Sequence, residues 1–130
     1  MITWPCKPYN IIWVDNDPFF LAWITPQVTA LPCFMVHTCG DAPTALHYLE
    51  RANPDIILTN LVMPYICGLE MMTLIRSRDA HIPMVVVSAR SQEYDRQAAL
   101  AAGASAFISK AGMSGRTVIA GIQPYLVWRD

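Results

Sequence analysis

The chain has 130 residues, of which 54% are hydrophobic and 15% are charged, and its formal net charge at pH 7 is −1. A chain of this length has room for one well-buried core, so we expect residues 1–130 to form a single domain. The low charged fraction argues against intrinsic disorder, and the near-zero net charge offers no electrostatic footprint for nucleic acid or for an anionic membrane surface.

The four cysteines have neither CxxC spacing nor a histidine pattern beside them, which argues against a zinc site; they are Cys6, Cys33, Cys39 and Cys67. We expect no signal peptide, because residues 1–9 contain two prolines and a lysine but no apolar segment. Reduced thiols and a cytoplasmic location follow. The longest uncharged stretch, residues 18–40, is interrupted by prolines and polar residues, so we expect no membrane span.

Five short apolar runs alternate with helix-like segments along the chain. The runs that we expect to form strands are Asn10–Val14, Phe34–His37, Asp55–Asn60, Met84–Ser88 and Ala106–Ser109. The first, third and fourth are nearly continuous in apolar residues. That pattern is typical of strands that helices cover on both faces of a parallel sheet.

We expect five helices. The first begins at Asp17–Pro18, and the second runs from Asp41 or Thr44 to Glu50. The other three run from Gly68 to Arg78, from Ser91 to Ala102 and from Ser114 to Trp128. Asp17 is a favourable N-cap, Pro26 should kink the first helix or end it early, and Gly103 should close the fourth. Five strand–helix units predict a doubly wound, flavodoxin-like α/β fold with strand order 2-1-3-4-5 and five helices.

Ligands of such sheets bind beyond the carboxyl ends of the strands. The polar residues expected there are Asp15 and Asn16 after the first strand, Asn60 ending the third, Ser88 ending the fourth and Lys110 ending the fifth. No glycine-rich loop follows the first strand, which argues against a dinucleotide or P-loop site. No Ser/His/Asp or Cys/His set is arranged for nucleophilic catalysis, so we do not expect an enzyme.

Four segments in this order resemble the receiver domains of two-component response regulators, which have a chemotaxis-regulator-like fold. The segments are Ile12–Pro18, Pro54–Pro64 with Gly68-Leu69-Glu70, Val87-Ser88-Ala89, and Ala102–Lys110. Residues 98–104, with Ala111-Gly112 after Lys110, are similar to the nitrate-regulator subfamily, whose receivers usually precede a helix-turn-helix domain.

The resemblance implies a role for each strand-end residue. In the family, a carboxylate after the third strand accepts a phosphoryl group, and an acidic pair after the first strand holds Mg²⁺. A hydroxyl residue and a lysine contact the phosphoryl oxygens, and an aromatic residue reorients on activation. By position these are Asn60 for the acceptor, Asp15 and Asn16 for the pair, Ser88 and Lys110 for the contacts, and Phe107 for the aromatic.

This sequence departs from the family pattern at two of these positions. Asn60 is an amide, which is a poor nucleophile and cannot form a stable acyl phosphate. Asn16 replaces one carboxylate of the metal pair, so Asp15 is the remaining acidic ligand, and Lys110 is expected beside it. We therefore expect a degraded Mg²⁺ site, with Asp15 a weak ligand at best, and no cofactor.

The sequence thus predicts a receiver-like interaction module that signals without aspartyl phosphorylation. Its partners would be proteins, with a histidine kinase or an output domain as candidates, and it would not bind nucleic acid or a membrane directly. An alternative is an ordinary phosphorylatable receiver of a DNA-binding transcriptional regulator that carries an Asp-to-Asn change at Asn60. A flavodoxin-like enzyme using the same cleft is a third hypothesis, disfavoured because no nucleophile, base or cofactor loop is evident.

The first and fifth helices predict an association surface. Residues 18–40 and 118–128 contain no Asp, Glu, Lys or Arg, whereas a helix packed on a sheet normally keeps a polar outer face. These two helices would lie side by side in the expected sheet, so their outward apolar residues would merge into one patch. We expect a symmetric homodimer through Phe20, Trp23, Ile119, Ile122 and Leu126. The alternative is that both helices are simply well buried.

Overall fold

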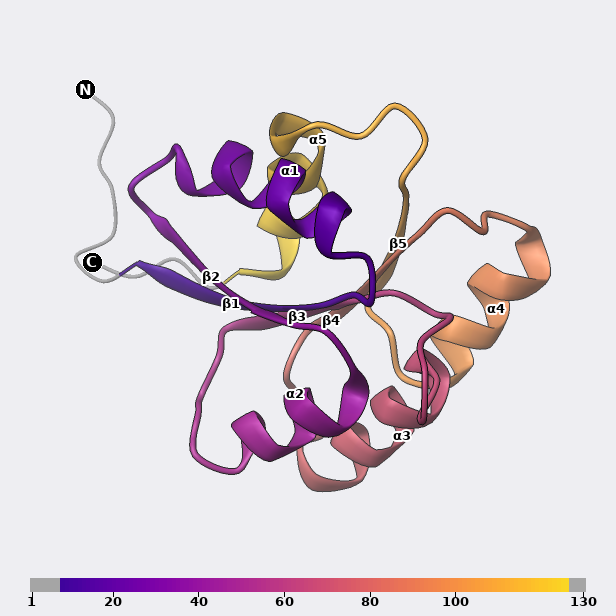
Figure 1. Cartoon of the computed structure of the whole chain (residues 1–130). Helices are drawn as coiled ribbons and strands as arrows, with labels where there is room; N and C mark the ends of the chain where they lie inside the picture. The colour runs from indigo at the N-terminus through magenta and orange to yellow at the C-terminus, as the bar shows by residue number, and fades with distance from the viewer. Residues whose placement is uncertain (1–7, 127–130) are drawn as a thin grey trace.

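A computed structural model describes residues 8–126 and contains a five-stranded parallel sheet in the order β2-β1-β3-β4-β5 (Figure 1). The strands are β1 (Tyr9–Val14), β2 (Phe34–Cys39), β3 (Ile56–Thr59), β4 (Met84–Ser88) and β5 (Ala106–Ser109). The helices are α1 (Pro18–Thr29), α2 (Ala42–Leu49), α3 (Gly68–Arg78), α4 (Glu93–Ala101) and α5 (Gly115–Ile122), with a 3₁₀ turn at Gln123–Tyr125. The predicted fold class and strand order are confirmed.

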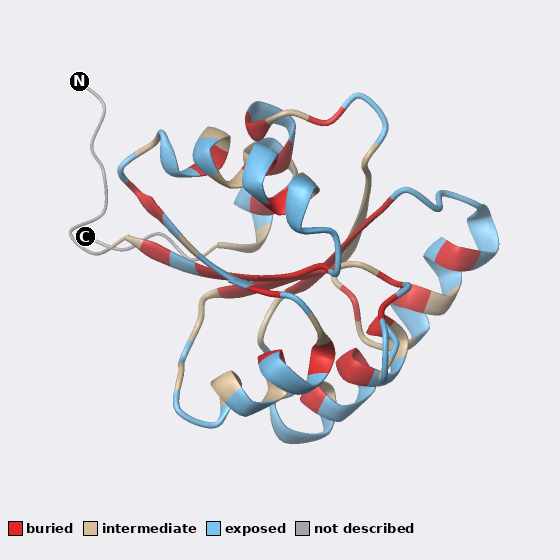
Figure 2. Cartoon of the chain, viewed as in Figure 1, coloured by how far each residue is buried: buried red, intermediate tan, exposed pale blue. Residues whose placement is uncertain are grey.

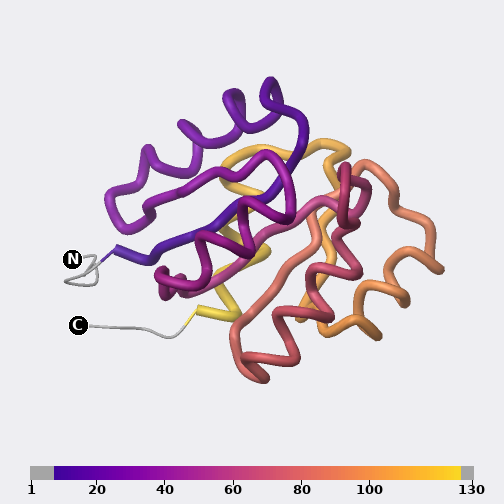
Figure 3. The backbone as a smooth tube through the Cα atoms, turned by 60° about the horizontal axis from the view of Figure 1, so that its bottom comes forward, coloured from indigo at the N-terminus to yellow at the C-terminus, as the bar shows by residue number. Residues whose placement is uncertain are grey.

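Helices cover both faces of the sheet, which is why its central strands are apolar along their whole length. Every residue of β3 and β4 is buried, as Figure 2 shows in red. Helices α1 and α5 pack over one face, around Trp13 and Ile24, and α2, α3 and α4 pack over the other, around Ile57 and Met71. In the turned view of Figure 3, the purple β1–α2 region and the orange α4 region lie at opposite sides of the molecule.

The parallel register aligns the carboxyl ends of neighbouring strands. Val14 of β1 is paired with Thr59 of β3, and Thr59 is paired with Val86 of β4. Ser88 at the end of β4 is paired with Ser109 of β5. The residues that follow these strands therefore meet at one edge of the sheet.

Several helix boundaries follow from local chemistry that the sequence displays. The Asp17 carboxylate accepts hydrogen bonds from the backbone N–H groups of Phe19 and Phe20, at 3.0 and 3.1 Å, which confirms it as the α1 N-cap. Asp41 caps α2 by accepting from Thr44 N at 2.8 Å. Gly103 has a φ of 110°, a conformation that favours glycine, where the chain leaves α4.

Pro26 does not end α1, because the helix continues to Thr29. Proline cannot donate a hydrogen bond to the carbonyl of Ala22, which costs local helix stability. Ile24 and Val28, on either side of Pro26, are both fully buried in the core. We infer that this burial outweighs the lost bond, since tertiary packing routinely overrides local propensity.

Two other helix ends differ from expectation. Helix α4 begins at Glu93 instead of Ser91, and α5 ends at Ile122, where a 3₁₀ turn that contains Pro124 takes over. Trp128, the predicted end of the fifth helix, lies outside the described residues. Within residues 8–126, no helix has the length and apolar character needed to cross a bilayer.

The predicted association surface is only partly exposed. Helices α1 and α5 do pack side by side, but Ile122 is fully buried beneath them and so does not belong to any surface patch. Phe20 is half-buried, with its ring 5.8 Å from that of the buried Trp13. Ile119 and Leu126 pack against the core, whereas Trp23 is 53% exposed. The residues of α5 that were expected outside are largely used to hold α5 on the sheet.

Candidate functional site

Polar residues gather where β1, β3, β4 and β5 end, and we use the name strand-end pocket for this group, which consists of Asp15, Asn16, Asn60, Ser88 and Lys110. The structure brings these predicted site residues to the same edge of the sheet. Asn60 N donates to the carbonyl of Val14 at 2.9 Å, and Lys110 N donates to the carbonyl of Ser88 at 2.9 Å. Backbone pairing of the sheet thus sets the position of each residue in the pocket.

Asp15 and Lys110 form a buried ion pair. Lys110 Nζ lies 2.7 Å from Asp15 Oδ2, and the Asp15 side chain is completely buried, whereas that of Lys110 is 18% exposed. The other carboxylate oxygen of Asp15 accepts a hydrogen bond from Asp17 N at 2.9 Å. A buried carboxylate without a counter-ion is strongly unfavourable, so the lysine neutralises the charge that the fold places here.

Lys110 also contacts an aromatic ring of α1. Its ammonium nitrogen lies 4.1 Å from the centre of the Phe20 ring, which is within the range of a cation–π interaction. Lys110 follows β5, whereas Phe20 lies in the first turn of α1. This contact therefore joins the pocket to the α1 side of the molecule.

The Asn60 side chain uses both its amide nitrogen and its amide oxygen. Nδ2 donates to Asn16 Oδ1 at 3.2 Å and to the Val62 carbonyl at 3.1 Å, and Oδ1 accepts from Leu61 N at 3.0 Å. Two of the partners are acceptors and one is a donor, so the set determines which amide atom is nitrogen. The amide nitrogen bridges two oxygens, one from the loop after β1 and one from the loop after β3.

Ser88 and Phe107 occupy positions that fit the predicted placement. Ser88 is 1% exposed, and its Oγ accepts a hydrogen bond from Arg90 N at 3.0 Å. Phe107 lies on β5 and is half-buried against the core beneath α2, α3 and α4. The hydroxyl of Ser88 therefore caps the turn after β4 and lies on the same edge as Lys110.

The described cysteines, Cys33, Cys39 and Cys67, are free thiols. Burial raises the pKa of the Cys39 thiol, and the nearby negative charge of Asp41 raises it further. Among residues 8–126, no group of three or more His, Cys, Asp or Glu side chains is arranged to hold a metal ion. Acidic character in the strand-end pocket is limited to Asp15 and the N-cap Asp17.

Two contacts of the pocket were missed by reasoning from the sequence. The Val62 carbonyl belongs to the backbone, so the type of residue at this position does not indicate the contact. Phe20 was assigned to an outer surface, although its place one turn after Asp17 puts it near the end of the first strand. An aromatic residue so close to a strand-end lysine is the signal that could have revealed the contact.

Comparisons with known proteins agree on one protein family. The family model described as the response regulator receiver domain matches residues 11–120. The chain is 35% identical over 101 residues to the transcriptional regulatory protein PrrA of Mycobacterium leprae, which covers 78% of this chain and 43% of PrrA. It is 34% identical over 93 residues to the sensory transduction protein RegX3 of Mycolicibacterium smegmatis, which covers 72% of this chain and 40% of RegX3. The chain thus spans less than half the length of these relatives.

Solved structures show the same architecture. The chemotaxis response regulator CheY4 of Vibrio cholerae matches with a TM-score of 0.83 at 20% identity, over 92% of this chain and all of that one. The receiver domain of the response regulator NarL from Mycobacterium tuberculosis also gives 0.83, at 19% identity, over 91% of this chain and 95% of that one. At these identities the likeness concerns the fold. Together with the family match, it shows that the chain belongs to the response regulator receiver domain family.

Proposed function

We propose that this chain is a receiver domain that acts as a protein-interaction module without aspartyl phosphorylation. The observation that carries the proposal is the hydrogen bonding of Asn60. Its amide nitrogen bridges Asn16 Oδ1 and the Val62 carbonyl, and its amide oxygen accepts from Leu61 N. The residue at the acceptor position is thereby part of the fixed structure of the pocket.

The chemistry of the amide supports this proposal. Phosphoryl transfer to a receiver needs an anionic oxygen that attacks phosphorus and remains bonded to it as an acyl phosphate. The Asn60 oxygen carries no formal charge, and its nitrogen lone pair is delocalised into the carbonyl. A neutral amide cannot supply the electron pair that the family reaction takes from a carboxylate.

The oxygens of the pocket do not suit Mg²⁺, the ion that the family implies. Magnesium requires a near-octahedral set of oxygen ligands and is held in proteins by one or two carboxylates. Asp15 is already neutralised by Lys110 at 2.7 Å, and Asn16 Oδ1 and the Val62 carbonyl accept from the Asn60 amide. An N–H donor stands between the two oxygens that a shared cation would have to approach. We derive no metal-assisted step in this pocket.

A second candidate function is a conventional receiver in which Asn60 replaces an acceptor aspartate, within a DNA-binding transcriptional regulator. The matched relatives favour it, since PrrA is described as a transcriptional regulatory protein and is more than twice the length matched here.

Receiver domains of two-component systems interact with histidine kinases and output domains. We propose the same classes of partner for this chain, in the cytoplasm, where its free thiols would stay reduced.

The two candidates differ in how Asn60→Asp behaves with a phosphodonor. We expect incubation of the purified chain with acetyl phosphate to leave its intact mass unchanged. If Asn60→Asp alone then gains one phosphoryl group in the presence of Mg²⁺, the second candidate is supported. A phosphoryl adduct on the unaltered chain that is lost in Asn60→Ala would overturn both.

We also propose self-association through the exposed aromatic residues of α1. Phe19 is 85% exposed and Trp23 is 53% exposed on one helix, and neither lies in the cores described above. Twofold pairing of one patch is the commonest form of assembly. Sedimentation at micromolar concentration tests it: we expect a dimer that dissociates in Trp23→Glu, and a monomer that Trp23→Glu leaves unchanged would rule the proposal out.

A further inference from the structure

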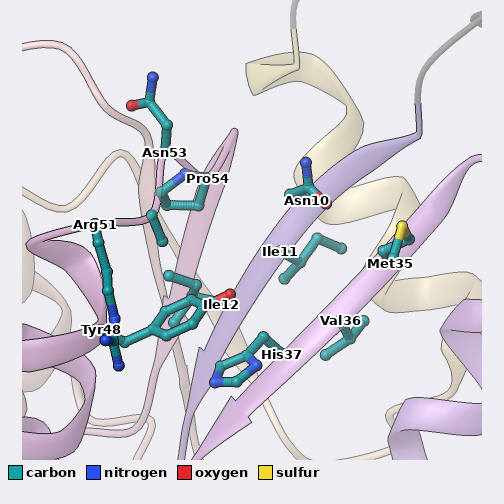
Figure 4. Close-up of a pocket in the computed structure, with 11 residues that line it drawn as sticks. Asn10, Ile11, Ile12, Met35, Val36, His37, Tyr48, Arg51, Asn53 and Pro54 are labelled. Carbon is teal, nitrogen blue, oxygen red and sulfur yellow. The ribbon is translucent and has the colours of Figure 1, made fainter.

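A second cleft lies away from the strand-end pocket, against the amino-terminal halves of β1 and β2 (Figure 4). Helix α2 has eight residues and spans about 12 Å, whereas the six-residue β2 spans about 20 Å. The helix therefore leaves part of the sheet uncovered. Asn10 is exposed even though β1 is an inner strand, and Met35 is 56% exposed. The resulting cleft has a volume of about 490 Å³, within the range of small-molecule sites.

One wall of the cleft is a preformed aromatic pair. The rings of His37 on β2 and Tyr48 on α2 are stacked, with their centres 3.9 Å apart and their planes inclined by 4°. Figure 4 shows the two rings face to face beneath the cleft, with Asn53 and Pro54 on one side and Asn10 and Met35 on the other. A rigid, flat pair of rings offers area for contact with another planar group at little cost in side-chain entropy.

Among residues 8–126, the side chains that line the cleft carry a positive charge, from Arg51, and no carboxylate. Arg51 forms no ion pair with any residue between 8 and 126. Asp55, which lies between Arg51 and β3 in the sequence, already accepts a hydrogen bond from Asn10 N at 2.7 Å. A guanidinium group presents a planar set of donors that matches a carboxylate or a phosphate.

The amides at the rim add directional contacts. Asn10 and Asn53 line the cleft on opposite sides in Figure 4, and each side chain carries both a donor and an acceptor. A flat ring with polar edge atoms could meet both of them. Apolar surface, a few polar groups and one charge are the usual composition of a small-ligand site.

We propose that this cleft binds a planar aromatic anion, with its ring against the His37–Tyr48 pair and its negative group on Arg51. Aromatic carboxylates and nucleoside monophosphates share this chemistry. The proposal does not involve Asn60, Asp15 or Lys110, so it stands or fails separately from the loss of phosphorylation. It gives the domain a place for a chemical input at the end of β1 opposite to the strand-end pocket.

The test is titration of the full chain, labelled with ¹⁵N, with three probes: 1-naphthoate, adenosine monophosphate and the neutral 1-naphthamide. We expect at least one of the two anions to shift the amide signals of Asn10, Met35 and His37 in a saturable way. Naphthoate alone would indicate a carboxylate ligand, and adenosine monophosphate alone a phosphate ligand. If neither anion shifts these signals, or if naphthamide binds as tightly as naphthoate, the proposal is wrong.

Three variants assign the binding to this cleft. Arg51→Gln should weaken the binding of the anion at least tenfold. Arg116→Gln is the matched control, because Arg116 is exposed on α5 at the opposite face of the sheet. His37→Ala removes one ring of the pair at an exposed position on an edge strand, so the fold should tolerate it. We expect it to weaken the binding of whichever anion the cleft binds. Equal loss in Arg51→Gln and Arg116→Gln would show non-specific attraction and overturn the proposal.

Discussion

Replacing Lys110 by methionine should test how far the Asp15–Lys110 pair holds the strand-end pocket together. Methionine keeps an unbranched apolar side chain near Phe20 but removes the charge that faces Asp15. The Asp15 carboxylate, which is completely buried, would keep one described hydrogen bond, from Asp17 N at 2.9 Å. Removing one partner of a buried pair typically costs about 3–5 kcal/mol, because the other charge stays buried without compensation.

The expected loss lies at the lower end of that range or just below it. The Lys110 side chain is 18% exposed, so water can partly reach the space that the ammonium leaves. We therefore expect the free energy of unfolding to fall by about 2–4 kcal/mol, out of a total of about 5–15 kcal/mol for a domain of this kind. Urea unfolding followed by tryptophan fluorescence measures it, since Trp13 is fully buried beside Phe20.

A double variant separates charge from packing. Asp15→Asn combined with Lys110→Met removes both charges, and replacing both partners of a buried pair is often close to neutral. We expect it to regain most of the loss. Arg96→Met, at an exposed position on α4, serves as the control for removing a cation. A loss below about 1 kcal/mol in Lys110→Met, or a double variant no better than the single one, would refute the view that the pair is structural.

Three further changes test the pocket and other parts of the domain. Asn16→Asp together with Asn60→Asp should create a Mg²⁺ response, measured as an ion-dependent rise in the unfolding midpoint that the unaltered chain does not show, because Asp15 would then be joined by two carboxylates. A double variant as insensitive as the parent would contradict this. Gly68→Ala should destabilise the fold by about 1–3 kcal/mol in urea unfolding, because its Cβ would overlap the Asn60 carbonyl oxygen; an unchanged midpoint would be inconsistent with that contact. Cys67, which is exposed, should react with a maleimide in the native state, whereas the buried Cys39, with its raised pKa, should react only on unfolding. Mass spectrometry of Cys67→Ser, which should take up one label fewer, provides the check.

The fold was predictable because its main signals are local and mutually consistent. Continuous apolar runs such as Met84–Ser88 indicated strands buried on both faces, and the structure buries all five residues of β4. Capping by Asp17 and the left-handed Gly103 also follow from single residues. Pro26 misled because its local effect on α1 is opposed by the burial of Ile24 and Val28, which only the assembled core reveals.

The placement of the candidate site residues at the strand ends was predictable, but their contacts were not. Strand-end position placed Asp15, Asn60 and Lys110 at one edge, since parallel strands end together. The bridge from Asn60 to the Val62 carbonyl depends on the path of a loop, which residue types do not specify. The same limit explains the error at Ile122: the lack of charged residues from 118 to 128 indicated an apolar stretch, but it did not indicate which side of α5 faced the sheet.

The hydrogen-bonded Asn60 amide also bears on the free energy that would be needed to shift such a domain from one conformation to another. If Asn60 accepts no phosphoryl group, as proposed above, two conformations can be shifted only by a ligand or partner that binds one of them more tightly. Moving a population from about 1:99 to about 99:1 in this way needs a ratio of affinities of about 10⁴, or about 5.5 kcal/mol. The concentration of that ligand or partner, and not the flux through a kinase, would then determine how long each state persists.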